Sequence, residues 1–131
     1  MRYLLDTVAW LWSLEPVSRL NNAAREILED SDQEVYLSPI TTLELSIKMR
    51  LGKLSFPAPP RQTVPRLMAR QGLAALAVTH AHSAKVYDLP LYHTDPFDRL
   101  LIAQALVEGM RIITSDRLFE KYTVDVLWCG R

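Results

Sequence analysis

Short hydrophobic runs along this chain alternate with longer segments in which apolar residues recur every three or four positions. Such runs are typical of buried strands, and the periodic segments are typical of helices packed on one face. We predict strands at 2–5, 35–37, 73–78, 111–114 and 124–127. We predict helices at 7–14, 18–30, 39–52, 63–71, 79–87, 96–109 and 117–122. This alternation predicts an α/β fold, a three-layer α/β/α sandwich in which helices cover both faces of a mostly parallel central sheet.

Residues that favour helix starts and ends mark several of these boundaries. Ser38 and Asp95 each precede a proline, the pattern of an N-cap followed by proline in the first turn. Ser18 is the predicted cap of the second helix, and Gly72 is expected to close the fourth. The Pro-rich stretch 56–61 is expected to be a connector between helices.

Two carboxylates follow predicted strands, where apolar side chains give way abruptly to an acid. Asp6 ends the first apolar run, and Asp116 comes shortly after the run at 112–113. Each could simply cap the helix that follows it. Both are also predicted at the carboxyl edge of the sheet, which is where α/β proteins bind ligands. Two acids at that edge are less easily explained as caps alone.

A third carboxylate, Asp98, lies on a helix face that is otherwise apolar. It precedes Leu101 by three residues and Ile102 by four, so it shares their stripe. An acid in a first helical turn is also favoured by the helix dipole, which is the ordinary explanation. Its place on the apolar face favours a metal-binding role, whereas Asp95 is better explained as the N-cap.

Glu44 repeats the pattern on another predicted helix. At helical spacing it shares a face with Ile40, Ile47 and Leu51. The competing explanation is a surface ion pair with Lys48 at the i,i+4 spacing, which is worth only a few tenths of a kcal/mol. Beside Asp98, the position of Glu44 favours a functional role.

Converging carboxylates require cations, because burying an unpaired carboxylate is costly. Hard divalent ions take oxygen ligands, so we predict a site for one or two Mg²⁺ or Mn²⁺ ions. Its predicted ligands, which are also the predicted catalytic residues, are Asp6, Glu44, Asp98 and Asp116. Thr7 and Ser115 are neighbouring hydroxyls that are expected to support a carboxylate or a water molecule beside the ion.

Composition limits the classes of protein that remain. The chain has 131 residues and 49% hydrophobic residues, which predicts one domain spanning 1–131. The formal net charge is zero, so a nucleic-acid partner would have to use a local patch. One cysteine, Cys129, fits a reducing cytoplasm. No run approaches a membrane span or the apolar region of a signal peptide, so we expect a cytoplasmic protein with no membrane partner.

The histidines and the cysteine give weaker signals. His80 and His82 are two residues apart on a predicted helix, so they face different directions and do not suggest a metal pair. His93 lies in a predicted loop, where capping or packing is the expected role and a substrate contact the alternative. Cys129 has no evident basic partner and is not interpreted as a nucleophile.

Four segments of the chain carry a resemblance to a known family. They are LLDT at 4–7, LELSIKMRLGKL at 43–54, HTDPFDRLLIAQA at 93–105 and TSDRLFEKY at 114–122. In this order, and over essentially the whole chain, they resemble the PIN-domain ribonucleases, and most closely the VapC toxin branch of type II toxin–antitoxin systems. The resemblance implies a PIN-like fold, and it places the family's four acids on the same four carboxylates.

The resemblance also implies an activity. The chain would be a Mg²⁺- or Mn²⁺-dependent endoribonuclease that acts as a toxin and hydrolyses RNA phosphodiester bonds with a metal-activated water. Lys48, Arg99 and Arg117 lie near the acids in sequence and are candidate contacts for RNA phosphates. The alternative is a non-catalytic binding module within a toxin–antitoxin repressor complex. A haloacid-dehalogenase type of phosphatase is disfavoured, because it would need an aspartate in place of Val8.

Partners are implied in the same way. The family suggests a homodimer and a cognate antitoxin protein that covers the site. Apolar side chains on the early predicted helices are expected to offer spare surface to such a partner. They are Leu11, Trp12, Leu14, Leu45, Met49, Leu67 and Met68.

Overall fold

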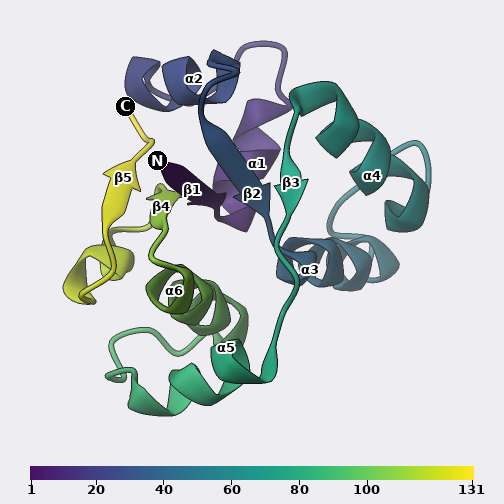
Figure 1. Ribbon diagram of the computed structural model, residues 1–131. Helices are drawn as coiled ribbons and strands as arrows, with labels where there is room; N and C mark the ends of the chain where they lie inside the picture. Colours follow the sequence, from purple (N-terminus) through teal and green to yellow (C-terminus); the bar gives the residue numbers. More distant parts are fainter.

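The computed structural model describes residues 1–131 and contains a five-stranded sheet with helices on both sides (Figure 1). The strand order is β3-β2-β1-β4-β5, and every neighbouring pair is parallel. The strands are β1 (Arg2–Leu5), β2 (Glu34–Leu37), β3 (Ala74–Ala75), β4 (Arg111–Thr114) and β5 (Val126–Trp128). The predicted α/β fold with a parallel sheet is therefore confirmed, and all five strands point their carboxyl ends to one edge.

Six α-helices and two short 3-10 helices connect the strands. The α-helices are α1 (Thr7–Ser13), α2 (Asn22–Glu29), α3 (Pro39–Arg50), α4 (Pro60–Gln71), α5 (His80–Lys85) and α6 (Pro96–Glu108). The 3-10 helices are η1 (Val86–Asp88) and η2 (Arg117–Lys121). In Figure 1, α5 and α6 lie on one side of the sheet and α1, α2 and α4 on the other. None of these helices is both long enough and apolar enough to cross a membrane.

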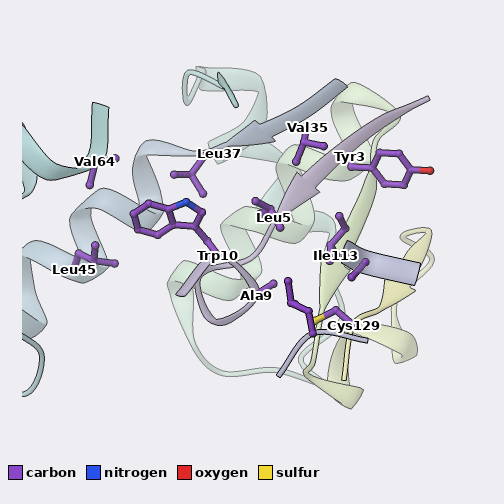
Figure 2. Close-up of a cluster of buried hydrophobic side chains, with 12 residues drawn as sticks. Tyr3, Leu5, Ala9, Trp10, Val35, Leu37, Leu45, Val64, Ile113 and Cys129 are labelled. Atoms are coloured by element: carbon purple, nitrogen blue, oxygen red, sulfur yellow. The ribbon is translucent and has the colours of Figure 1, made fainter. Parts of the chain in front are cut away.

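Alternation along the strands divides the core between the two faces of the sheet. Tyr3 and Leu5 of β1 pack with α1, α2 and α4 in one buried cluster, and Leu4 packs with α6 in the other. The ring of Trp10 points toward Leu37, Val64 and Leu45 within the first cluster (Figure 2). Burial on both faces explains why the strands are continuous hydrophobic runs rather than alternating ones.

The surface expected to be spare for a partner is largely part of this core. Leu45 is fully buried. Leu11, Trp12, Leu14, Leu67 and Met68 are partly buried and pack against the first cluster. The prediction of a free apolar surface on these residues is wrong for Leu45 and only partly right for the others. The reason is that α1 and α4 pack in the same core cluster and Leu45 of α3 reaches into it.

Helix α2 begins later than predicted, because Asn21 caps it in place of Ser18. The Asn21 side chain accepts from the Ala24 amide at 3.0 Å and donates to the carbonyls of Trp128 and Gly130 at 2.9 and 3.0 Å. It therefore caps the helix and also ties it to the end of β5, which the Ser18 hydroxyl could not do. Ser18 instead accepts from the Leu20 amide.

Several other predicted boundaries differ from the structure. Strand β5 is Val126–Trp128 rather than 124–127, the helix predicted at 79–87 divides into α5 and η1, and the helix predicted at 117–122 is the 3-10 helix η2. Helix α4 starts at Pro60 rather than at 63, because proline suits the first helical position, so part of the stretch read as a connector is helical. Strand β3 is reduced from the predicted 73–78 to Ala74–Ala75. It is an edge strand that pairs only with Tyr36 and Leu37 of β2, and both of its alanines are exposed.

Candidate active site

Asp6 is a buried carboxylate at the carboxyl end of β1. As the N-cap of α1 it accepts from the Ala9 amide at 2.7 Å, and its other oxygen accepts from the Thr114 hydroxyl at 2.5 Å. Burial raises the pKa of Asp6 to about 6, although these two hydrogen bonds act in the opposite direction. The neighbouring charges of Asp116 and Glu44 contribute to this raised pKa in the same direction as burial. Asp6 is thus both a cap and a member of an acidic group.

Glu44 is buried on α3, where two hydroxyls fix its carboxylate. The Thr7 hydroxyl donates to Oε1 at 2.7 Å and lies 3.0 Å from the Thr41 hydroxyl. Burial raises the pKa of Glu44, and the Lys48 ammonium, 4.0 Å from Oε2, lowers it. The predicted ion pair with Lys48 therefore exists beside the site role that we predict for Glu44. Lys48 contacts Oε2 weakly, and Oε1 is held by the Thr7 hydroxyl.

The apolar face assigned to Glu44 is only half correct. Ile40 is buried, but Ile47 is 40% exposed and Leu51 is 63% exposed. Helix α3 contributes Leu45 to one core cluster and Ile40 to the other, so it packs beside the sheet rather than across a face. Its far end consequently projects into solvent, and the face that carries Glu44 opens outward.

Asp98 occupies the first turn of α6, directly behind the Asp95 cap. Asp95 accepts from the amides of Phe97 and Asp98, which confirms its predicted capping role. Burial, together with the neighbouring charge of Asp95, raises the pKa of Asp98 to about 7. The nearby carboxylates of Glu44 and Asp6 act in the same direction, whereas the contact with His93 lowers the pKa. These mutual effects place Asp98 within electrostatic range of both other acids.

Asp116 completes the group from the segment after β4. Its Oδ1 caps η2 by accepting from the Leu118 amide at 2.9 Å, and its own amide donates to the Thr114 hydroxyl. Its Oδ2 lies 2.8 Å from Nε2 of His93. Thr114 therefore links Asp116 to Asp6, which is the supporting role that we expected of Ser115. The structure assigns it to the preceding residue because Thr114 is buried at the end of β4.

His93 was not predicted to lie among the acids. Its Nε2 is 2.8 Å from Oδ2 of Asp116 and 3.1 Å from Oδ2 of Asp98. One ligand atom from each of these three residues falls within 4.8 Å of the others, a spacing that could hold a metal ion. The sequence signals were the position of His93 two residues before the Asp95 cap and its place at the start of the segment 93–105 that carries the resemblance, because nothing in the spacing relates it to Asp116.

The predicted role of Arg99 as a phosphate contact is wrong. Its guanidinium is buried and donates to the backbone carbonyls of the segment 86–93. Lys48 and Arg117 do remain accessible. Arg117 lies 3.6 Å above the ring of Trp128 and 3.1 Å from Glu120, and Lys48 is next to Glu44 on α3.

The donor set fits a hard divalent ion. Asp98 and Asp116 bring ligand atoms within 4.8 Å of each other and of His93, and the charges of Asp6 and Glu44 act on Asp98. The cost of burying Asp6, Glu44 and Asp98 is visible in their raised pKa values. A divalent cation would favour their ionised forms. The positively charged side chains nearby neutralise these carboxylates poorly. The Arg99 guanidinium donates to the backbone of the segment 86–93 instead, and the Lys48 ammonium lies 4.0 Å from Oε2 of Glu44.

These raised pKa values predict a pH dependence of stability. A carboxylate whose folded-state pKa exceeds its unfolded value stabilises the fold at low pH, and that stability is lost as pH rises through the folded pKa. For Asp98 the window runs from about pH 4 to about pH 7, and the shift corresponds to roughly 2–4 kcal/mol. We therefore expect the free energy of unfolding of the metal-free protein, measured in urea with EDTA, to decrease across this pH window.

The Asp98→Asn variant is the matched control for that experiment, because it lacks the titrating group. Its stability should decline less between pH 5 and pH 8 than that of the wild type. Added Mg²⁺ should stabilise the wild type more at pH 8 than at pH 5, because the ion competes with protons. Parallel profiles for the two proteins in EDTA would contradict the assignment of a raised pKa to Asp98.

Comparisons with known proteins show the family to which the chain is similar. The family model described as the PIN domain matches residues 3–124. Ribonuclease VapC22 of Mycobacterium tuberculosis is 32% identical over 116 residues, which cover 87% of this chain and 86% of that protein. Ribonuclease VapC16 of the same organism is 41% identical over 63 residues, which cover 48% of this chain and 45% of that protein.

Solved structures share the fold at low sequence identity. The chain from VapBC2 of Rickettsia felis, bound to a DNA fragment from its promoter, has a TM-score of 0.74 and 14% identity. That match covers 99% of this chain and 100% of the other. A chain from a toxin–antitoxin complex of Klebsiella pneumoniae has a TM-score of 0.66 and 16% identity, with 96% of each chain covered.

Proposed function

This chain belongs to the PIN domain family, and we propose that it is a divalent-metal-dependent endoribonuclease of the VapC type that acts as a toxin. Four carboxylates support the proposal: Asp98 and Asp116 lie close enough to share an ion, and the charges of Asp6 and Glu44 act on Asp98. They come from segments far apart in the sequence, and burial raises the pKa of three of them. A group assembled at such a cost is typical of a functional site.

We assign the ion to Asp6, Glu44, Asp98 and Asp116. When bound, a divalent ion would lower the pKa of a water molecule and neutralise charge on the scissile phosphate. The chain's own contribution is to hold its carboxylates in place: Thr114 and the Ala9 amide fix Asp6, and Thr7 fixes Glu44. Because these groups are set before RNA arrives, little reorganisation is needed during the reaction.

Substrate binding is assigned to the exposed cations beside the acids. Lys48 lies 4.0 Å from Glu44 on α3, Arg117 begins η2 directly after Asp116, and both side chains reach solvent. Such side chains contact phosphates and fix the register of a nucleic acid without reading its bases. With a formal net charge of zero, the chain has no general attraction for RNA, so these local contacts matter more.

Cleavage of RNA by the purified protein tests the proposal. We expect cleavage of a mixed RNA substrate with Mg²⁺ or Mn²⁺, no cleavage in EDTA, and recovery when excess Mn²⁺ is added back. Internal cuts, seen with a circular RNA, would identify an endonuclease. Equal cleavage with and without EDTA would contradict a metal-dependent enzyme. Failure to cleave any RNA under conditions where Mn²⁺ binds would instead favour a non-catalytic binding role.

We also propose that an antitoxin protein and a second copy of this chain are its partners. The proposal draws on the structural neighbours, several of which were solved as toxin–antitoxin assemblies. Apolar side chains on α3 that this chain leaves exposed, Leu43, Ile47 and Leu51, are available to such partners. Light scattering of the purified protein would test self-association, and a monomer at all concentrations would contradict the dimer.

A further inference from the structure

The ring of His93 is held in one orientation and one protonation pattern. The Asp95 amide donates to Nδ1 at 3.2 Å, so the proton of the neutral ring is on Nε2. That nitrogen faces Oδ2 of Asp116 at 2.8 Å and Oδ2 of Asp98 at 3.1 Å. The ring also packs edge-on against Phe119, with 5.8 Å between ring centroids, and the side chain is only 12% exposed. His93 thus directs a fixed N–H group to Asp116, with which it is hydrogen-bonded, and holds the same nitrogen 3.1 Å from the carboxylate of Asp98.

The backbone of His93 is fixed as firmly as its ring. Its amide donates to the Tyr122 hydroxyl at 2.8 Å, and its carbonyl accepts from the buried Arg99 guanidinium at 3.3 Å. Tyr122 in turn donates to the carbonyl of Pro90 at 2.9 Å. The loop before α6 is therefore attached to the core at several points, so the Nε2–H group cannot drift from the acids without breaking these contacts.

We propose that His93 is a positioning residue whose Nε2–H group holds the carboxylates of Asp98 and Asp116 together, arranged to receive a divalent ion. The inference rests on the proposed function. Two carboxylates in close contact repel each other, and a shared N–H donor offsets that repulsion before the ion binds. If Nε2 bound the metal ion directly, the proton of the neutral ring would have to be on Nδ1. There it would face the N–H group of Asp95, which now donates to Nδ1. The geometry therefore makes His93 a donor to the ligands rather than a ligand.

Partners that orient metal ligands typically change metal affinity by 10–100-fold when they are removed. We therefore expect His93→Leu, which keeps the bulk and loses the donor, to weaken Mn²⁺ binding by about that factor in calorimetry. His93→Gln places an amide N–H near the position of Nε2 and should restore most of the affinity. His80→Leu is the matched control, because His80 is exposed and outside the site. It should bind Mn²⁺ like the wild type.

Spectroscopy separates positioning from ligation. In the metal-free wild type, ¹⁵N NMR should find the proton of the neutral His93 ring on Nε2. In the Mn²⁺-bound protein, pulsed EPR should show the same ¹⁴N couplings in the wild type and in His93→Leu. A proton on Nδ1, a ¹⁴N coupling that His93→Leu removes, or a His93→Gln variant as weak as His93→Leu would overturn the inference. Wild-type affinity for Mn²⁺ in His93→Leu would also overturn the inference, but that result would leave the proposed function intact. A wild type that binds no Mn²⁺ would overturn the proposed function and this inference together.

Discussion

Asp98→Asn is expected to reduce the rate of RNA cleavage by about 10³-fold or more while leaving the fold intact. Asparagine keeps the size of the side chain and removes its negative charge, so the site loses a ligand at its centre. A catalytic metal ion lowers the activation barrier by several kcal/mol, and about 4 kcal/mol corresponds to three powers of ten in rate. The measurement is the cleavage rate under single-turnover conditions at saturating Mn²⁺.

Stability provides the control for that variant. Burial raises the pKa of Asp98 to about 7, so ionising this carboxylate in metal-free protein costs free energy that asparagine avoids. We expect metal-free Asp98→Asn to be at least as stable as the wild type at pH 8, the pattern of a site whose function opposes stability. Asp88→Asn, at an exposed carboxylate paired with Lys85, should cleave normally. Wild-type cleavage by Asp98→Asn would remove Asp98 from the site.

Arg99→Ala is expected to destabilise the protein by about 3–5 kcal/mol. The Arg99 guanidinium donates to four backbone carbonyls, two of which belong to Leu89 and Pro90, and it lies within 3.4 Å of the Tyr122 hydroxyl. Alanine would leave these acceptors without a donor in a buried place, and each unsatisfied group costs about 1–3 kcal/mol unless water reaches it. Urea denaturation measures the loss.

Arg117→Ala is the matched comparison for the loss at Arg99. Arg117 is exposed, pairs with Glu120 on the surface and lies over the Trp128 ring, so its removal should change the free energy of unfolding by about 1 kcal/mol or less. It should weaken RNA binding instead, with a shallower dependence on salt. If Arg99→Ala retained full stability and lost RNA binding, Arg99 would be a phosphate contact after all.

The acidic group could be predicted because each of its members breaks a local hydrophobic pattern. Asp6 follows a buried run at the end of β1, and Asp98 precedes the buried residues Leu101 and Ile102 on α6. Strand and helix periodicity fixes the face on which such residues lie, and a parallel sheet brings strand ends to one edge. Local pattern together with fold class was therefore sufficient to place Asp6 and Asp98 near each other.

The residues that sequence reasoning missed depend on the path of the chain in three dimensions. His93 reaches Asp116 because Tyr122 and Arg99 fix the loop before α6, and no spacing rule relates residues 23 positions apart. Arg99 was misassigned for the same reason, since nearness in sequence to an acid does not show where a long side chain points. Thr114 replaced Ser115 because burial at a strand end depends on which of two adjacent side chains faces inward.

A single titration tests the central claim that these acids bind the ion that cleaves RNA. The fraction of protein with Mn²⁺ bound and the cleavage rate would be measured on the same samples as Mn²⁺ is increased, for the wild type and for Asp98→Asn. The account predicts that the two curves rise together in the wild type, and that Asp98→Asn loses cleavage with weakened Mn²⁺ binding. Cleavage that persists in EDTA, or that is unchanged in Asp98→Asn, would contradict it.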